Sequence, residues 1–162
     1  MKRLNIHTLK SSGYYDKDQI LLHACFQILV DFIEKEKPHK ITEDQIRRCE
    51  DEQEGEILRR QKDDQDEAFD LYDWWVNRRS LRKDPIMKDG ISSPPILFEP
   101  IEVNGVKYSK MIDNSKNPKY KDWYDVVKES ARLEADIVEE DQRNLHKLID
   151  IRSYLWTWRK IV

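Results

Sequence analysis

The amino-acid sequence predicts a mainly α protein in which a small β-hairpin is inserted between the second and third of three long helices. Charged residues make up 38% of the chain and glycine only 4 of 162 positions, a composition that suits long helices with solvated faces. Apolar residues recur with helical periodicity near both ends of the chain. Between these two regions, an Asn-Gly pair with alternating apolar neighbours indicates a tight hairpin turn.

Length and composition favour one folded domain spanning residues 1–162, because a chain of this size buries about two thirds of its unfolded surface. The formal charge of −3 provides no net positive field to attract nucleic acid or a membrane. Cys25 and Cys49 lack metal-binding spacing, which predicts two free thiols in a reducing compartment. No apolar stretch suits a signal peptide or a membrane span, so we expect a soluble cytoplasmic protein.

The first predicted helix begins near residue 15 and ends before Pro38, because a proline disfavours helical geometry in the residue before it. Its apolar side chains cover about two thirds of the circumference, which predicts a deeply buried helix. His23, Gln27 and Asp31 share one narrow polar sector. We expect this sector to face solvent.

The second predicted helix begins at Thr42, whose capping-box partner is Gln45, and extends to about Lys83. Only Gly55 weakens the helical pattern, so one continuous helix of roughly 60 Å is expected. Apolar residues are sparse in its first half and more frequent from Leu71 onward. The first half should therefore be solvated or bound to a partner, while the second half packs on the core.

The predicted hairpin covers residues 96–112, with Asn104 and Gly105 in a type I′ turn. Its register places apolar pairs on one face and opposite charges on the other: Val103 with Val106, Ile101 with Tyr108, and Glu102 with Lys107. Pro100 should end the ladder, because proline has no N–H to donate.

The third predicted helix runs from about Lys119 to the C-terminus and carries a broad apolar stripe. Glu134, Asp141 and Arg152 interrupt this stripe. A charge on a core face needs a partner, so we expect an ion pair between Arg152 and an acidic residue.

A metal site between the first and third helices is an alternative hypothesis for these polar residues. His23 and Asp31 could face Glu134 and Asp141, as inward side chains do in bundles that bind two metal ions. Those bundles use Glu-x-x-His pairs, and the pair found here, residues 36–39, contains a proline at a helix end. We therefore predict no metal and no cofactor.

The segment LYDWWVNRRSLRK, residues 71–83, places aromatic side chains beside arginines. Such residues are enriched in protein interfaces and also stack on nucleic-acid bases, although acidic residues crowd this helix. Successive helical residues point about 100° apart, so both tryptophans are not expected to bury against one helix. We predict Trp74, Trp75, Arg78 and Arg79 as partner-binding residues, with burial in the core as the alternative.

Two acidic segments, EDEQE at 50–54 and EAFD at 67–70, are similar to the EExxE and ExxD motifs of MazG-like all-α nucleoside triphosphate pyrophosphohydrolases. Asp51 replaces the second glutamate, and the family's two helices would require a turn near Gly55. The resemblance implies a magnesium site that binds the triphosphate, formed by Glu50, Glu54, Glu67 and Asp70. The alternative is a solvated face with i,i+4 ion pairs, such as Glu56 with Arg60.

Two further segments, LLHACFQILVDFIEKEKP and LYDWWVNRR, together resemble small uncharacterised proteins of tailed bacteriophages. In that group a helix of LLHxxFQxLVDFxE type precedes a Tyr/Asp-Trp-Trp segment. The resemblance implies action in the cytoplasm of the infected cell or within a virus particle. The group has no assigned activity, so no functional residue follows from it.

The sequence therefore favours a non-enzymatic interaction or assembly protein that binds a protein partner or itself through its long charged helix, with the exposed edge of the hairpin as a second candidate surface. Nucleic-acid and membrane partners are not expected, given the charge balance. Cys25 lies in an apolar run that should raise its pKa, and no phosphate-binding or nucleophile motif is present. The alternative is a magnesium-dependent nucleotide pyrophosphohydrolase.

Overall fold

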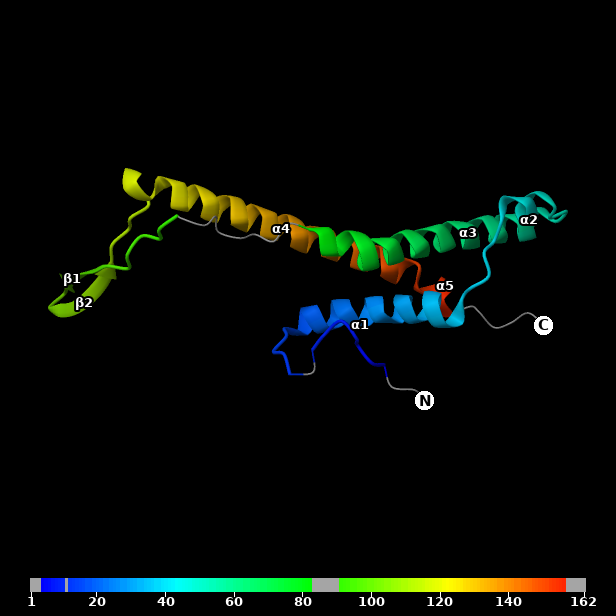
Figure 1. The fold of residues 1–162 in the computed structure, drawn as a ribbon, viewed down its shortest axis with the longest axis horizontal. Helices are drawn as coiled ribbons and strands as arrows, with labels where there is room; N and C mark the ends of the chain where they lie inside the picture. Colours follow the sequence, from blue (N-terminus) through cyan, green and yellow to red (C-terminus); the bar gives the residue numbers. More distant parts are fainter. Residues whose placement is uncertain (1–3, 11, 83–90, 157–162) are drawn as a thin grey trace. The chain divides into compact units, whose positions relative to one another are not determined.

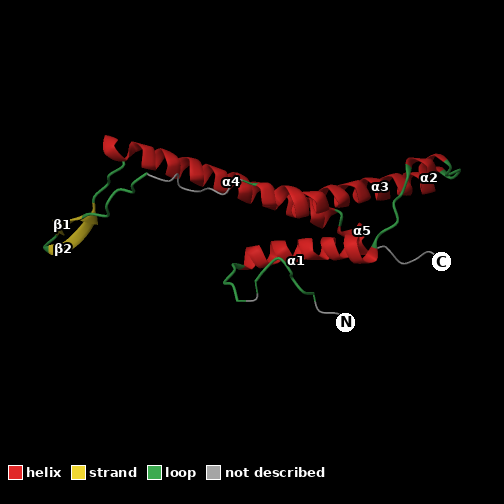
Figure 2. Cartoon of the chain, in the orientation of Figure 1, coloured by secondary structure: helices red, strands yellow, loops and turns green. Residues whose placement is uncertain are grey.

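The computed structural model describes residues 4–10, 12–82 and 91–156 and confirms the mainly α fold with a hairpin between the second and third long helices (Figures 1 and 2). The chain groups into two compact units. The first unit combines Met1–Arg82 with Glu139–Val162, and the second is Lys83–Val138. Each unit is described in turn.

Helix α1 spans Lys17–Asp31 and continues as a π-helical turn, Phe32–Glu36. Lys37 then adopts a left-handed conformation with φ of 50°, directly before Pro38. Left-handed geometry and the following proline both stop a helix, so the predicted boundaries are confirmed.

The prediction of one continuous helix from Thr42 to about Lys83 is wrong. Helix α2 spans only Glu43–Arg47, and α3 begins at Glu52 and runs to Asp73. The break occurs because Asp51 forms a second N-cap: its carboxylate accepts a hydrogen bond from the backbone N–H of Glu54 at 2.9 Å. Beyond Asp73 the chain continues through a π-helical turn, Trp74–Arg78, and a 3₁₀ turn, Arg79–Leu81.

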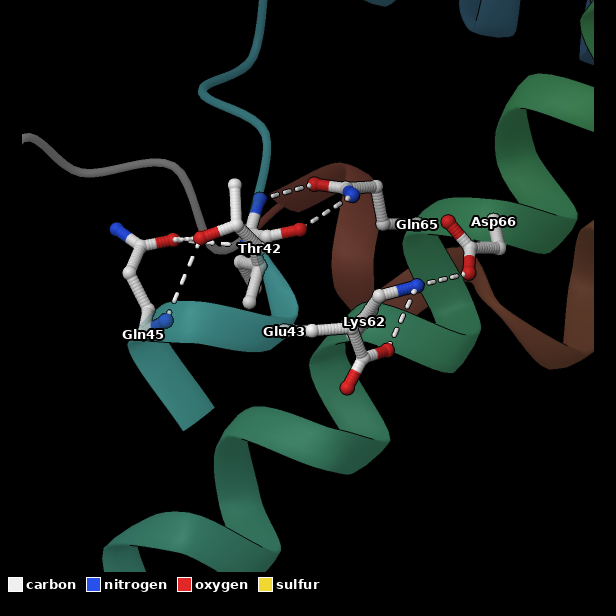
Figure 3. A network of polar contacts seen from close by, with 7 residues as sticks. Thr42, Glu43, Gln45, Lys62, Gln65 and Asp66 are labelled. Carbon is white, nitrogen blue, oxygen red and sulfur yellow. Dashed lines mark hydrogen bonds and ion pairs between the residues drawn. The ribbon is translucent and has the colours of Figure 1, made fainter. Parts of the chain in front are cut away.

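Polar contacts fix α2 against α3 (Figure 3). The capping box predicted at Thr42 and Gln45 is present. The Gln65 side chain accepts a hydrogen bond from the Ile41 N–H at 2.9 Å, so α3 also binds the backbone that leads into α2. Lys62 adds ion pairs to Glu43 at 3.5 Å and Asp66 at 2.5 Å.

The core of the first unit lies between α1, the C-terminal end of α3 and the residues from Leu148 onward, including α5, Arg152–Trp156. Figure 1 shows α1 and α5 beside the end of α3. The buried side chains are mostly large and apolar: Leu22, Phe26, Leu29, Phe32, Ala68, Leu71, Trp74, Trp75, Leu148, Ile151 and Tyr154. These residues come from three parts of the chain. The core therefore forms only when the N-terminal and C-terminal segments pack together.

The second unit contains the hairpin, in which β1, Phe98–Val103, pairs antiparallel with β2, Val106–Met111. Asn104 and Gly105 have φ of 55° and 79°, the positive values that a type I′ turn requires. All three predicted cross-strand pairs are present, which confirms the register.

Pro100 does not end the ladder as predicted. It lies inside β1, opposite Ser109. Because Val103 and Val106 flank the two-residue turn and bond to each other, alternate pairs along the ladder bond and the pairs between them do not. Pro100 and Ser109 form one of the non-bonded pairs, so the N–H that proline lacks would have pointed away from β2.

A 3₁₀ turn, Pro118–Tyr120, leads into helix α4, Lys121–Asp150. The start of this helix agrees with the predicted start near Lys119. The predicted continuous run to the C-terminus is interrupted by a turn at Ile151 between α4 and α5, and residues 157–162 lie outside the described residues. Among the described residues, no helix combines the length and hydrophobicity needed to cross a membrane.

Candidate functional site

Both tryptophans of the predicted binding segment are buried, with only 4% of Trp74 and 7% of Trp75 exposed. The Trp75 ring stacks on Phe26 of α1 with centroids 4.4 Å apart, and the Trp74 ring lies 5.2 Å from the same phenylalanine. The expectation that both could not bury against one helix is therefore wrong. The segment is a π-helical turn, and its greater number of residues per revolution brings neighbouring side chains closer in direction.

Arg79 and Arg82 bind the carboxylates of Asp141 and Glu140 in a cluster that we call the arginine clasp. Arg79 Nη2 lies 3.0 Å from Asp141 Oδ2, and Arg82 Nη2 lies 2.5 Å from Asp141 Oδ1. Arg82 Nε also pairs with Glu140 at 2.8 Å. The clasp joins the segment after α3 to the C-terminal part of α4, two regions about sixty residues apart in the sequence.

Aromatic rings shield the clasp from solvent on one side. The guanidinium carbon of Arg79 lies 4.6 Å from the Trp75 ring centroid, and that of Arg82 lies 5.0 Å from the Trp74 ring centroid. The indole N–H of Trp74 donates to Glu140 Oε1 at 2.9 Å. Cation–π contacts and ion pairs thus act on the same two guanidinium groups, which holds both arginines in fixed positions.

Arg78 differs from its neighbour because it remains exposed. It pairs with Asp70 at 2.6 Å and Asp73 at 3.0 Å, both on the surface of α3. All four residues predicted to bind a partner therefore have partners within the first unit. Trp74, Trp75 and Arg79 stabilise its core, and Arg78 pairs along its own helix.

Arg152 was expected to neutralise an acidic residue on the apolar stripe of the third helix, but it does not neutralise Asp141. Arg152 is exposed and its Nη1 donates to the Ile149 carbonyl at 2.8 Å. Asp141, flagged as a charge on the apolar stripe, is instead bound by the arginine clasp, and Glu134 is exposed. Arg82 is thus a structural residue that the sequence did not single out.

Two residues of the polar sector of α1, His23 and Gln27, do not face solvent, contrary to prediction, whereas Asp31 is partly exposed. His23 is 8% and Gln27 only 4% exposed, because residues 4–10 cover them. The hydroxyl of Thr8 and Nδ1 of His23 share a hydrogen bond of 2.6 Å. The His7 N–H donates to Gln27 Oε1 at 3.0 Å, and Gln27 Nε2 donates to Asp31 at 2.8 Å.

We expect Thr8→Val to release residues 4–10, because the buried imidazole of His23 then loses its hydroxyl partner at a cost of about 1 kcal/mol. Hydrogen exchange at the His7 amide measures this release, with a loss of protection of roughly fivefold. Thr8→Ser retains the hydroxyl and should behave like the wild type. Equal protection in the valine and serine variants would contradict the assignment.

The hydrogen bond between Thr8 and His23 should weaken in acid. Burial and the Arg79 charge lower the pKa of His23, against the opposing effect of Asp141. The neutral imidazole is therefore favoured in the folded state, so its contribution is present above about pH 6.5 and is lost as pH falls through its lower folded pKa. Protection of the His7 amide, corrected for intrinsic exchange, should therefore be highest above about pH 6.5 and should fall as the pH falls through the folded pKa of His23.

The four acidic residues of the pyrophosphohydrolase motif do not converge. Glu54 and Glu67 lie thirteen residues apart on one uninterrupted helix, α3, which is about 20 Å along its axis. The chain turns at residues 48–51, before Gly55. The two motif segments, 50–54 and 67–70, are therefore not on two facing helices. Glu67 pairs with Lys147 at 2.9 Å and Asp70 with Arg78. Within one chain, these carboxylates cannot bind a common ion.

Among the described residues, no cluster of three or more His, Cys, Asp or Glu side chains could hold a metal ion. His23 and Asp31 are engaged by Thr8, Gln27 and Lys35, as ordinary hydrogen bonds and an ion pair. These contacts explain the polar residues of α1 without a ligand.

An open pocket of about 510 Å³ lies beside Trp75, between residues 7–8 and α1. Its charged side chains already have partners: Asp31 pairs with Lys35 at 2.7 Å, and Glu34 accepts from the Tyr72 hydroxyl at 2.9 Å. A ligand would have to displace these contacts, so the pocket does not define a site.

The two cysteines are free and half-buried. Burial raises the pKa of the Cys25 thiol, as predicted from its apolar surroundings. A raised pKa leaves less thiolate at neutral pH, so Cys25 is poorly suited to nucleophilic catalysis.

Comparison with known proteins identifies no relative: no family model matches the chain, and neither a curated protein nor a solved structure matches it.

Proposed function

We propose that this protein is a non-enzymatic interaction or assembly protein that binds a protein partner or itself through the hairpin of its second unit. The observation that supports this proposal is an apolar face of the hairpin that is exposed to solvent. We define the apolar hairpin face by residues that alternate along the two strands and their extensions, and the ion pair between Glu99 and Lys110 lies among them. The apolar residues of this face are Leu97, Ile101, Val103, Val106, Tyr108 and Ile112.

The side chains of this face are large and accessible. Val103, Val106 and Tyr108 are each about half exposed, at 50%, 51% and 52%. A two-stranded hairpin is only marginally stable alone, and large exposed apolar side chains grouped near its turn commonly mark an interaction site. A partner that covers this face would therefore stabilise the hairpin and remove apolar area from water.

The long charged helix offers a less suitable surface than the sequence suggested. On α3, Arg60 pairs with Glu56 at 2.7 Å, the i,i+4 pair expected for a solvated face. Lys62 and Gln65 are used to bind α2 and the preceding backbone (Figure 3). These internal contacts move the proposed binding surface from the helix to the hairpin.

The resemblance to tailed-phage proteins extends the proposal to a setting. We propose that the protein acts in the cytoplasm of the infected cell or within a virus particle, where the partner would be a phage or host protein.

The double variant Val106→Thr with Tyr108→Thr tests the proposal. Threonine retains β propensity but removes apolar contact area, so self-association or partner binding should weaken about tenfold or more. Sedimentation velocity at increasing protein concentration measures self-association. Affinity capture from infected and uninfected host lysates, quantified by mass spectrometry, measures partner binding.

A matched control places threonine on the opposite face of the same hairpin, as Glu102→Thr on β1. This control should associate and capture as the wild type does. Equal association and capture by the wild type, the control and the apolar-face variant would overturn the proposal.

A further inference from the structure

The hairpin has two free edges that differ in their capacity to pair with another strand. It forms a sheet of two strands only, among the described residues, so the outer side of each strand is unpaired. Since Val103 and Val106 bond to each other, the backbone groups of alternate residues point outward. These are Phe98, Pro100 and Glu102 on β1, and Lys107, Ser109 and Met111 on β2.

The outer edge of β1 is blocked at its centre. Pro100 lies midway along that edge and has no N–H to donate, the device by which natural sheets discourage strand addition. The outer edge of β2 has no proline, and its three outward residues are all exposed. Of the two edges, only that of β2 presents a complete set of donors and acceptors.

We propose that the β2 strands of two copies of this chain pair antiparallel at this edge, about a twofold axis through Ser109. This inference rests on the proposed function and names a second copy as the occupant. Two hairpins then form one four-stranded sheet, which meets the minimum of about three strands for independent stability. Cross-strand neighbours share a face, so the two apolar hairpin faces lie on the same side.

The side chains of β2 favour this register. An axis at Ser109 places Ser109 opposite its copy, and Lys107 opposite Met111 of the second copy. On the other face, Tyr108 lies opposite Lys110 and Val106 opposite Ile112, giving a cation–π pair and an apolar pair. No lysine faces a lysine directly.

Neighbouring registers are less favourable. An axis at Lys107 or Lys110 brings two identical lysines together, and like charges directly opposite each other are destabilising. An axis at Tyr108 shortens the overlap and places Val106 opposite Lys110. The Ser109 register combines the longest overlap with the absence of repulsion, as a self-complementary twofold interface requires.

Charge complementation at the proposed axis provides the test. The wild type should sediment at twice its chain mass of 19.6 kDa. Ser109→Lys and Ser109→Glu each place like charges across the axis, so each alone should dimerise about tenfold more weakly. An equimolar mixture should recover the dimer, because lysine then faces glutamate. Ser92→Lys, an exposed position outside the strands, is the charge control and should dimerise normally.

Amide exchange in the wild type provides a test that needs no variant. Protection at Lys107, Ser109 and Met111 should rise with protein concentration, because these amides are unbonded in a single hairpin. The amides of Phe98 and Glu102, on the blocked edge, should exchange quickly at every concentration.

The outcomes separate the two proposals. A wild type that stays monomeric to about 100 μM, or a dimer with unprotected β2 amides, overturns the edge pairing but leaves partner binding intact. Association that depends on Val106 and Tyr108 but not on the charge at Ser109 would also overturn the edge pairing and leave partner binding intact. Association that depends on neither, together with unchanged capture, overturns both proposals.

Discussion

Replacement of Phe26 by alanine is expected to lower the unfolding free energy of the first unit by about 3–5 kcal/mol. Phe26 has no exposed surface, and its ring stacks on Trp75 at an interplanar angle of 9°. The variant leaves a cavity between α1 and Trp74, and it also removes aromatic contacts worth about 0.5–1.5 kcal/mol each. Since typical domains are stable by about 5–15 kcal/mol, this one change consumes a large share.

Hydrogen exchange of peptides from Lys17–Asp31 measures this loss locally. A local measurement is needed because the chain contains two units, which need not unfold in one two-state transition. Leu21→Ala is the matched control on the same helix, since Leu21 is 55% exposed. It should cost less than about 1 kcal/mol. Similar losses for both variants would mean that Phe26 is not the centre of this core.

Local sequence signals predicted the elements that depend on neighbouring residues. The end of α1 followed from Pro38, and the hairpin register followed from Asn104 and Gly105. In each case a backbone preference acts over a few positions and needs no knowledge of the rest of the fold. The Asp51 N-cap carried the same kind of signal, because Asp51 is followed three residues later by Glu54. The residues on both sides of Asp51 are also compatible with a continuous helix, so the two signals compete.

Contacts between distant segments could not be predicted in this way. The periodicity of α1 identified His23 and Gln27 as one polar sector, but nothing in the helix indicates that residues 4–10 cover them. Polar residues in a sector can be solvated or can bind another segment, and both arrangements satisfy their hydrogen bonds. The sequence pattern alone does not distinguish these cases.

The arginine clasp shows the same limit at the candidate site. Asp141 was recognisable as a charge that needs a partner, because it interrupts an apolar stripe. Its partners, Arg79 and Arg82, lie about sixty residues earlier, whereas Arg152 was the arginine available within the same helix. Which arginine binds the carboxylate depends on how α3 and α4 pack, and this information is absent from either helix alone.

Substitution Asp141→Asn should lower the unfolding free energy by about 2 kcal/mol. Removing one partner from a buried ion pair costs roughly 3–5 kcal/mol, and the partial exposure of this cluster reduces that cost. The side chains of Asp141, Arg79 and Arg82 are 16%, 26% and 15% exposed. Asparagine keeps the shape of the aspartate but removes the charged partner of Arg79 and leaves Arg82 paired with Glu140 alone. Urea denaturation, monitored by hydrogen exchange of residues 141–150, measures the loss.

The contribution of Asp141 should also disappear in acid. Burial acts to raise the pKa of this carboxyl group, but the hydrogen bonds and charges of Arg79 and Arg82 outweigh it, so the net pKa is lowered. A lowered folded pKa means that the stabilisation is present above the unfolded value of about 3.9 and is lost as pH falls through the folded pKa. The difference in stability between the wild type and Asp141→Asn should therefore be constant from about pH 7 to 5 and should shrink below about pH 4.

A control for the clasp is Asp70→Asn, which removes one of the two carboxylate partners of Arg78 and leaves Asp73. Both side chains of that pair are about half exposed, so water and salt screen the interaction and the expected cost is below about 1 kcal/mol. A double-mutant cycle between Asp141→Asn and Arg82→Met should yield a coupling energy of about 1 kcal/mol or more, whereas Asp141→Asn and Arg78→Met should be additive. Equal costs for the two aspartate variants would show that burial does not strengthen the clasp, and that packing of Trp74 and Trp75 on Phe26 alone stabilises this part of the unit.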